Sequence, residues 1–188
     1  KADLDIDSLA KFLDCDKGRS IDRFLLCGDI GDPIYYPQLF DFIKRFRDTK
    51  KFDIRTNGSY QTEEFWNTLA SLLGPQDTIT FGIDGLEDTH HLYRIGTKYE
   101  AVVRNASTFI NEGGIAEWVF IKFKHNEHQV EQAKQMATDL GFFNILVRNT
   151  GRFFNHKDIS EMDVWPVLDN RKQVEYYLEV PEQVQYRN

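Results

Sequence analysis

The sequence predicts an α/β fold in which parallel strands alternate with helices. Five short apolar runs are each bounded by turn-forming residues, and apolar residues recur at helical spacing between the runs. Such alternation is typical of a parallel sheet with right-handed crossovers. A closed eight-stranded barrel needs about 200 to 250 residues, and the pattern stops near Arg148. The sheet is therefore either an open doubly wound sheet or an incomplete barrel.

The composition is that of a soluble globular domain. The chain has 188 residues, of which 41% are hydrophobic and 28% charged, and this length is enough for one domain with a core. The net charge of -7 argues against a nucleic-acid surface, which needs a basic patch. No apolar run approaches the ~20 residues of a membrane helix, so we expect neither nucleic acid nor membrane as a partner.

The two cysteines, Cys15 and Cys27, set a limit on the chemistry of this chain. They are too few for a disulfide scaffold, or for a zinc or iron–sulfur site built from cysteines of this chain alone. A reducing cytoplasm is the expected compartment. Because Cys27 follows apolar residues, we expect it to be a buried small hydrophobic residue rather than a nucleophile.

The first three strands and their helices follow in order along the first half of the chain. A first helix is expected to present an apolar face made of Ile6, Leu9, Phe12 and Leu13. The predicted strands are 24–27, 52–58 (a strand with its turn) and 78–83. Helices at 39–46 and 62–73 separate them, the second beginning at a capping threonine and ending before Gly74 and Pro75.

The second half of the pattern adds two strands, at 118–123 and 142–147. A helix around 102–110 precedes the first of them, and another follows it, with Asn126 as N-cap and Gln129 in the capping-box position. Residues 151–188 show no sustained period. We therefore predict a partial barrel over 1–150 and a tail or linker over 151–188.

Polar residues stand at the ends of all five predicted strands. In a parallel sheet these ends share one edge, where binding sites of α/β folds form. Acids at one side and bases at the other would suit a small zwitterionic ligand. The alternative is that the Asp-Gly and Asn-Gly pairs only form turns. The candidates are Gly28, Asp29, Gly31, Asp32, Thr56, Asn57, Asp84, Lys122, Lys124, Asn126 and Arg148.

Histidine pairs are weaker candidates. Adjacent His90 and His91 point apart, and His125 and His128 have no evident third ligand, so a metal site is not expected at either pair.

Several of these motifs, taken in order, resemble the radical S-adenosylmethionine (radical SAM) superfamily over about residues 20–150. The resemblance is to the branch that carries an additional C-terminal cluster-binding module, the SPASM or twitch type. The motifs are Gly28-Asp29-Ile30-Gly31-Asp32-Pro33, Pro37-Gln38-Leu39, Thr56-Asn57-Gly58, Ile83-Asp84-Gly85-Leu86-Glu87-Asp88-Thr89-His90 and Tyr93-Arg94.

This resemblance implies a partial (βα)6 barrel, with about five of its strands in this chain, and a site for S-adenosylmethionine at its mouth. The Gly-Gly-Glu-Pro-like motif that binds the methionine ammonium corresponds to Gly31-Asp32-Pro33, with Asp in place of Glu. Arg94 corresponds to the arginine that meets the methionine carboxylate. Gly82 stands where a serine is common, which leaves Asp84 as the polar candidate on that strand. Asn126 and Arg148 correspond to ligand-facing positions of the last strands.

The Cys-x-x-x-Cys-x-x-Cys loop that holds the 4Fe–4S cluster in this superfamily is absent from the sequence. The resemblance therefore implies that these residues are the central piece of a longer enzyme, inactive alone, in which the cluster is held elsewhere. That enzyme would use a 5′-deoxyadenosyl radical to abstract hydrogen from a peptide or small-molecule substrate. One alternative is a degenerate barrel that acts as a binding or scaffold domain. An ordinary barrel enzyme for a phosphorylated metabolite is disfavoured, because no late glycine-rich phosphate loop is present.

Overall fold

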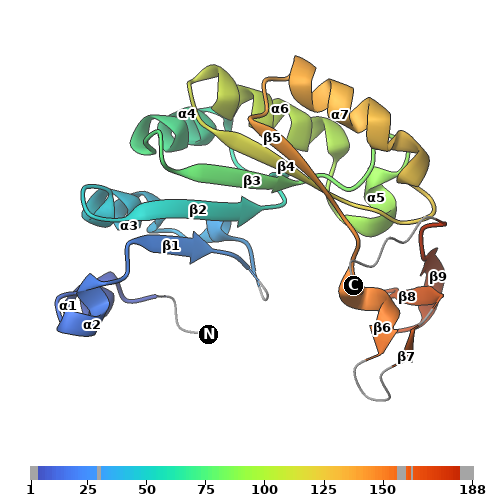
Figure 1. Cartoon of the computed structure of the whole chain (residues 1–188), viewed down its shortest axis with the longest axis horizontal. Coiled ribbons are helices and arrows are strands. Elements are labelled where there is room, and N and C mark those ends of the chain that lie inside the picture. The colour runs from blue at the N-terminus through green and yellow to red at the C-terminus, as the bar shows by residue number, and fades with distance from the viewer. Residues whose placement is uncertain (1–3, 29–30, 156–159, 162, 183–188) are drawn as a thin grey trace.

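The computed structural model describes residues 4–28, 31–155, 160–161 and 163–182. One parallel sheet with the strand order β1-β2-β3-β4-β5 forms its centre (Figure 1). The strands are β1 (Arg23–Leu26), β2 (Lys51–Thr56), β3 (Thr78–Gly82), β4 (Ala116–Ile121) and β5 (Asn144–Arg148). The predicted fold class, a partial α/β barrel, is confirmed, because the five strands follow one another in the sheet and alternate with helices.

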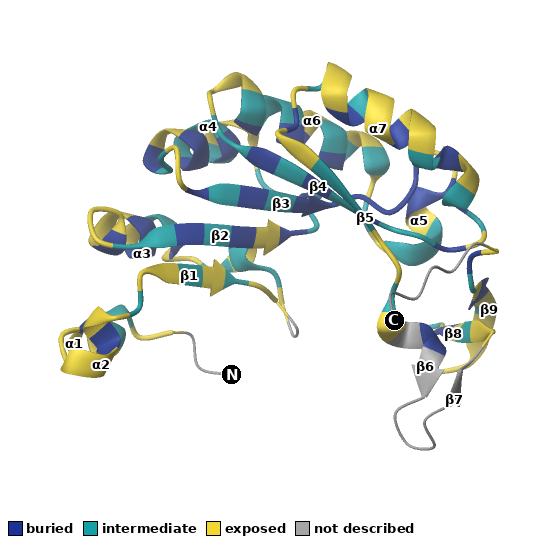
Figure 2. Ribbon diagram, in the orientation of Figure 1, coloured by how far each residue is buried: buried dark blue, intermediate teal, exposed yellow. Residues whose placement is uncertain are grey.

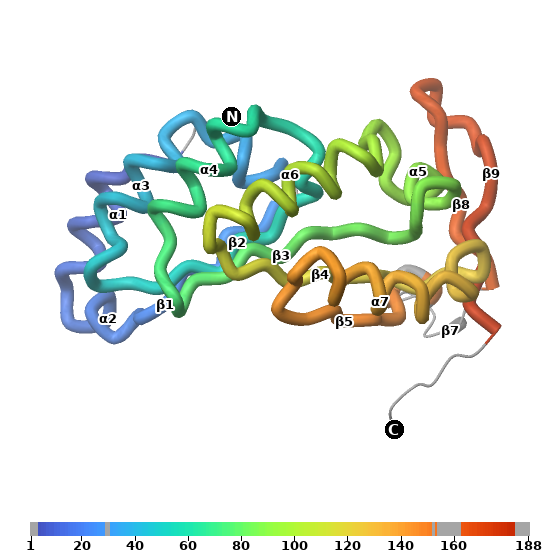
Figure 3. The backbone as a smooth tube through the Cα atoms, turned by 90° about the horizontal axis from the view of Figure 1, so that it is seen from above, coloured from blue at the N-terminus to red at the C-terminus, as the bar shows by residue number. Residues whose placement is uncertain are grey.

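The helices cover one side of the sheet. In Figure 1 the sheet forms an arch with α4, α6 and α7 over its convex side, and Figure 3 shows the same helices side by side from above. No described helix covers the concave side. The helices are α1 (Ile6–Leu13), α2 (Asp16–Arg19), α3 (Leu39–Phe46), α4 (Glu63–Leu72), α5 (His90–Tyr93), α6 (Tyr99–Asn111) and α7 (Val130–Asp139), with 3₁₀ turns η1 (Pro33–Tyr35), η2 (Glu127–Gln129) and η3 (Gly151–Phe153).

The core between sheet and helices is rich in aromatic rings. Phe81 of β3 lies at its centre, with its ring centroid 5.3 Å from that of Trp66, 6.3 Å from Phe109 and 6.2 Å from Phe142. Buried residues alternate with more exposed ones along β2 and β4 (Figure 2), as expected for strands that have one face against the helices. The opposite, inner face carries the alternate residues of each strand.

Three local expectations were wrong. Phe12 is 53% exposed, because the buried stripe of α1 is formed by Ala10 and Leu13. Cys27 is exposed, since β1 ends at Leu26 and the thiol lies beyond the apolar run. No capping box forms at the last helix, because the Gln129 side chain instead accepts hydrogen bonds from Leu86 N and Thr89 Oγ1.

The region for which the sequence predicts a tail or linker contains short antiparallel strands. These are β6 (Phe154–Asn155) with β7 (Ser160–Glu161), and β8 (Val164–Leu168) with β9 (Val174–Glu179). In Figure 1 they lie beyond the carboxyl ends of β4 and β5.

The β8–β9 hairpin packs against the end of β4. Phe123, Phe153, Val167 and Leu178 form a second small core there. The Tyr176 hydroxyl donates a hydrogen bond to Leu92 O, which ties the hairpin to α5. Part of the chain beyond residue 150 is thus folded onto the barrel. No helix within the described ranges combines the length and apolar character required to cross a bilayer.

Candidate functional site

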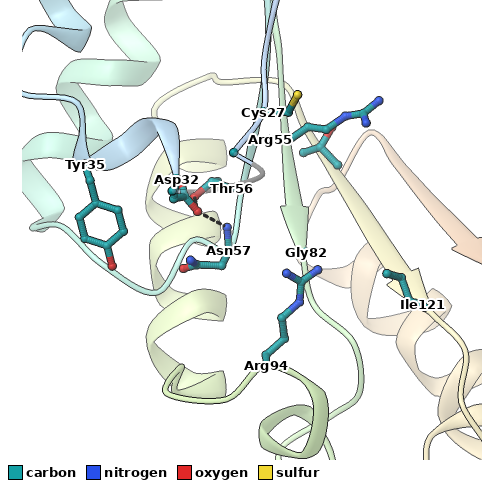
Figure 4. A pocket seen from close by; sticks show the side chains of 12 residues that line it. Cys27, Asp32, Tyr35, Arg55, Thr56, Asn57, Gly82, Arg94 and Ile121 are labelled. Carbon is teal, nitrogen blue, oxygen red and sulfur yellow. Dashed lines mark hydrogen bonds between the residues drawn. The ribbon is translucent and has the colours of Figure 1, made fainter. Parts of the chain in front are cut away.

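A cavity of about 710 Å³ opens where the carboxyl ends of β1, β2 and β3 meet (Figure 4). This volume lies in the range of about 300 to 1,000 Å³ that small-molecule and cofactor sites occupy. The lining residues are Cys27, Gly28, Gly31, Asp32, Tyr35, Arg55, Thr56, Asn57, Thr80, Gly82, Arg94 and Ile121. Six predicted candidates, Gly28, Gly31, Asp32, Thr56, Asn57 and Arg94, therefore come together at one mouth.

Asp32 ties the first strand end to the second. Its Oδ2 accepts hydrogen bonds from Thr56 Oγ1 at 3.0 Å and from Asn57 N at 2.7 Å. Within the described part of the chain, its Oδ1 accepts one hydrogen bond, from Ile34 N at 3.2 Å, at the start of η1. A carboxylate oxygen has two acceptor positions. Oδ1 can thus accept one more donor, such as an ammonium group in the cavity.

The loop before Asp32 requires glycine at one position. A Cβ atom at Gly28 would lie 1.4 Å from Gly31 O, so no other residue fits this close backbone approach. A Cβ at Gly31 would meet nothing within 4 Å, which leaves open space beside the backbone at the cavity wall. Asp29, also a predicted candidate, lies outside the described residues.

Arg94 is fixed against the end of β3. Its Nε donates a 2.6 Å hydrogen bond to Oδ2 of Asp84, a carboxylate with no exposed surface. The other oxygen of Asp84 accepts a bond from Ile121 N at 2.5 Å. In Figure 4 the guanidinium lies against Gly82, and a Cβ there would be 2.3 Å from Nη2. Glycine at this position makes room for the arginine, and Asp84 positions Arg94 without itself lining the cavity.

A buried histidine supports the segment that carries Arg94. Thr97 Oγ1 donates its hydrogen to Arg94 O, so it can only accept from His90 Nε2, 2.8 Å away. His90 Nδ1 is buried and has no hydrogen-bond partner among the residues that the structure describes. Burial, reinforced by the nearby Arg94 charge, lowers the pKa of His90 to about 4. This imidazole is therefore neutral at pH 7, with its proton on Nε2.

Four further candidates do not line this cavity: Lys122, Lys124, Asn126 and Arg148. Lys124 Nζ instead lies 3.1 Å from Glu179 Oε2 of β9. Asn126 is fully buried, and its side chain bonds three backbone groups: Phe123 N, Asp84 O and Ile121 O. It joins the ends of β3 and β4. Arg148 lines a neighbouring cavity on the inner face of the sheet instead of the first one.

Six lining residues are not among the predicted candidates: Cys27, Tyr35, Arg55, Thr80, Gly82 and Ile121. Arg55 and Thr80 carry a detectable signal, because each alternates with the buried apolar residues of its strand and must therefore face inward. Tyr35 lies in a turn and has no such periodicity. Its ring stacks on that of Tyr60, with 4.8 Å between the ring centroids. Burial together with the Asp32 charge raises the pKa of the Tyr35 hydroxyl. The hydroxyl therefore stays a hydrogen-bond donor.

An iron–sulfur cluster does not fit the residues of this chain. Such clusters need three or four cysteine thiolates, and the sequence has two cysteines. Cys15 caps α2, whereas Cys27 lines the cavity beyond β1, so the strand separates them. Among the described residues, no three His, Cys, Asp or Glu side chains are grouped closely enough to hold a metal ion.

No protein-family profile matches the sequence, and no curated protein matches it. Solved structures do match its fold. SuiB from Streptococcus suis, bound to the precursor peptide SuiA, aligns with a TM-score of 0.69 and 14% identity over 86% of this chain and 36% of its own. Native anSMEcpe with bound AdoMet aligns with a TM-score of 0.59 and 14% identity, over 80% of this chain and 43% of its own. TYW1 with a lysine–pyruvate adduct aligns with a TM-score of 0.56 and 14% identity, over 95% of this chain and 65% of its own.

These three neighbours are radical SAM enzymes, and the present chain shares their fold. The chain spans less than two thirds of the length of each of them. At 14% identity the match concerns the fold alone.

Proposed function

We propose that this chain is the central part of a radical SAM enzyme and that the cavity at the strand ends binds S-adenosylmethionine. The observation that carries the proposal is the fixed Arg94 guanidinium facing Asp32 across one cavity. Arg94 would bind the methionine carboxylate, and Asp32 Oδ1 would accept from the ammonium group. The fold shared with AdoMet-bound anSMEcpe supports this assignment.

The remaining lining residues would orient the cofactor and exclude water. Tyr35 offers an aromatic face and a hydroxyl donor at the rim, and the Gly31 wall lets the ligand approach the backbone. In the complete enzyme S-adenosylmethionine would supply a radical for hydrogen abstraction from a peptide or small-molecule substrate. The cluster that this chemistry requires would have its ligands outside the present sequence.

The cysteine count favours a second candidate, a barrel that binds its ligand without radical chemistry. Both candidates include the same cavity. Reconstitution of iron and sulfide into a longer protein that contains this sequence separates them, since only the enzyme would hold a stoichiometric 4Fe–4S cluster.

Calorimetry with S-adenosylmethionine tests the binding site directly. Arg94→Gln alone removes the guanidinium that is paired with the buried Asp84 carboxylate, and the loss of this ion pair can destabilise the chain. The informative variant is therefore Asp84→Asn with Arg94→Gln, which removes both charges. We expect its affinity to fall at least about tenfold, the loss of one strong charge-assisted contact.

Arg104→Gln, on α6 and outside the cavity, is the matched control and should bind like the wild type. Equal affinity of the double variant and the wild type would remove Arg94 from the site. A wild-type chain that binds no S-adenosylmethionine at about 1 mM would overturn the proposal.

A further inference from the structure

A second cavity, of about 340 Å³, lies on the inner face of the sheet beside the first one. The two cavities share Arg55, Thr80 and Ile121 in their linings, so they adjoin. The second cavity continues away from the proposed cofactor site across β4 to β5, where Arg148 and the residues after it line it.

Three charged side chains line this second cavity: Arg55, Glu117 and Arg148. In the strand register, Arg55 lies beside Thr80 and Thr80 beside Glu117, so these three residues form one row across β2, β3 and β4. Arg148 lies on β5 next to Ile121. The two arginines therefore approach the cavity from opposite edges, and the glutamate lies between their strands.

None of these three charged side chains has a hydrogen bond or ion pair with the residues that the structure describes. Arg23 on the same face provides a contrast, because its Nη1 lies 2.5 Å from Asp53 Oδ1 and it lines neither cavity. Glu117 is also half-buried, which removes part of its hydration. Charged groups that line a cavity and lack partners are available to a ligand.

We infer that the second cavity binds an amino acid or peptide by its carboxylate and by an adjacent N–H group. The arginines offer planar N–H pairs that match a carboxylate, and Glu117 offers an acceptor for an ammonium or amide N–H. Two cations and one anion give this cavity a positive balance in a chain of net charge -7. A phosphate carries more negative charge and no N–H, so Glu117 disfavours it. Only the identification of this ligand as the substrate rests on the proposed function.

Nuclear magnetic resonance titration of the 188-residue chain at low ionic strength tests the inference. The probes are N-acetylglycine, glycinamide and inorganic phosphate. N-acetylglycine has both a carboxylate and an amide N–H, and we expect it to shift the signals of Thr80, Val119 and Leu146, which line the cavity. Glycinamide lacks the carboxylate and should not bind, and phosphate should bind more weakly than N-acetylglycine.

Arg148→Gln is the principal variant, because Arg148 lines only the second cavity. It should raise the Kd for N-acetylglycine about tenfold and leave the affinity for S-adenosylmethionine unchanged. Arg23→Gln is the matched control, since it removes the same charge from the same face, and it should leave both affinities unchanged. Circular dichroism verifies that each variant is folded.

An equal Kd for N-acetylglycine in the wild type and in Arg148→Gln would overturn the inference, as would tighter binding of phosphate than of N-acetylglycine. Failure of the same protein to bind S-adenosylmethionine would overturn the proposed function and leave the carboxylate site standing. The two failures are thus distinguishable in one preparation.

Discussion

The two faces of the five-stranded sheet are built from alternate residues of the same strands, and they differ in burial and in charge. On the convex face, Phe52, Phe81 and Trp118 are fully buried beneath helices. On the inner face, Arg55, Glu117 and Arg148 carry charge and line cavities. A period-two pattern in a parallel strand therefore separates the residues that hold the fold from those available for binding.

The largest expected effect comes from breaking this division within β3, where Thr80 and Phe81 are neighbours. Phe81→Ala should destabilise the fold by about 3–5 kcal/mol, because it leaves a cavity among Trp66, Phe109 and Phe142. Thr80→Ala should change the free energy of unfolding by no more than about 0.5 kcal/mol. Urea unfolding measures both. Similar losses in the two variants would mean that the inner face also contributes to the core.

Much of this division could be predicted from the sequence. The apolar runs locate all five strands to within two residues, since each is framed by turn residues. The strand-end positions of Asp32, Thr56 and Asn57 follow from the topology, because parallel strands deliver their carboxyl ends to one edge. These parts depend only on local pattern and chain direction.

The parts that could not be predicted depend on contacts between distant segments. Asp84 and Asn126 are polar like Asp32, yet the side chains of both form hydrogen bonds inside the protein and do not line the cavity. The reason for a glycine at position 82, which is the room it leaves for Arg94, is visible only in the folded chain. The β8–β9 hairpin has too short a pattern to be recognised, and it is held by its packing on Phe123.

His90 is buried beside the cavity mouth, and its titration should make the stability of the fold depend on pH. Its pKa is about 4 in the folded chain and 6.5 in the unfolded chain, so between these values the unfolded state binds more protons. Stability from the neutral imidazole is complete above pH 6.5 and is lost as the pH falls to 4, by up to about 3 kcal/mol. The free energy of unfolding, measured by urea titration at several pH values, gives this slope.

His90→Gln should flatten that slope, because glutamine can still donate to Thr97 Oγ1 but does not titrate. Part of the slope should remain, since burial also lowers the pKa of His125. His91→Gln is the control on an exposed neighbour and should keep the wild-type slope. A slope that is unchanged in His90→Gln would show that the imidazole is not held neutral.

A smaller loss of stability than in Phe81→Ala, and the sharpest test of the boundary between the two faces, is expected from Gly82→Ala. The new Cβ would lie 2.3 Å from Arg94 Nη2, the flexible end of a side chain, so the guanidinium should move rather than the strand. We expect less than about 1 kcal/mol of destabilisation and, if Arg94 binds the cofactor, an affinity for S-adenosylmethionine about tenfold lower. Gly74→Ala is the control, because its Cβ would make only an ordinary 3.6 Å contact.

The Arg94 Nε–H resonance reports the displacement of the guanidinium in Gly82→Ala independently of any ligand. A shifted resonance with unchanged affinity would separate the position of Arg94 from cofactor binding, whereas an unshifted resonance would mean that the strand end yields before the arginine does.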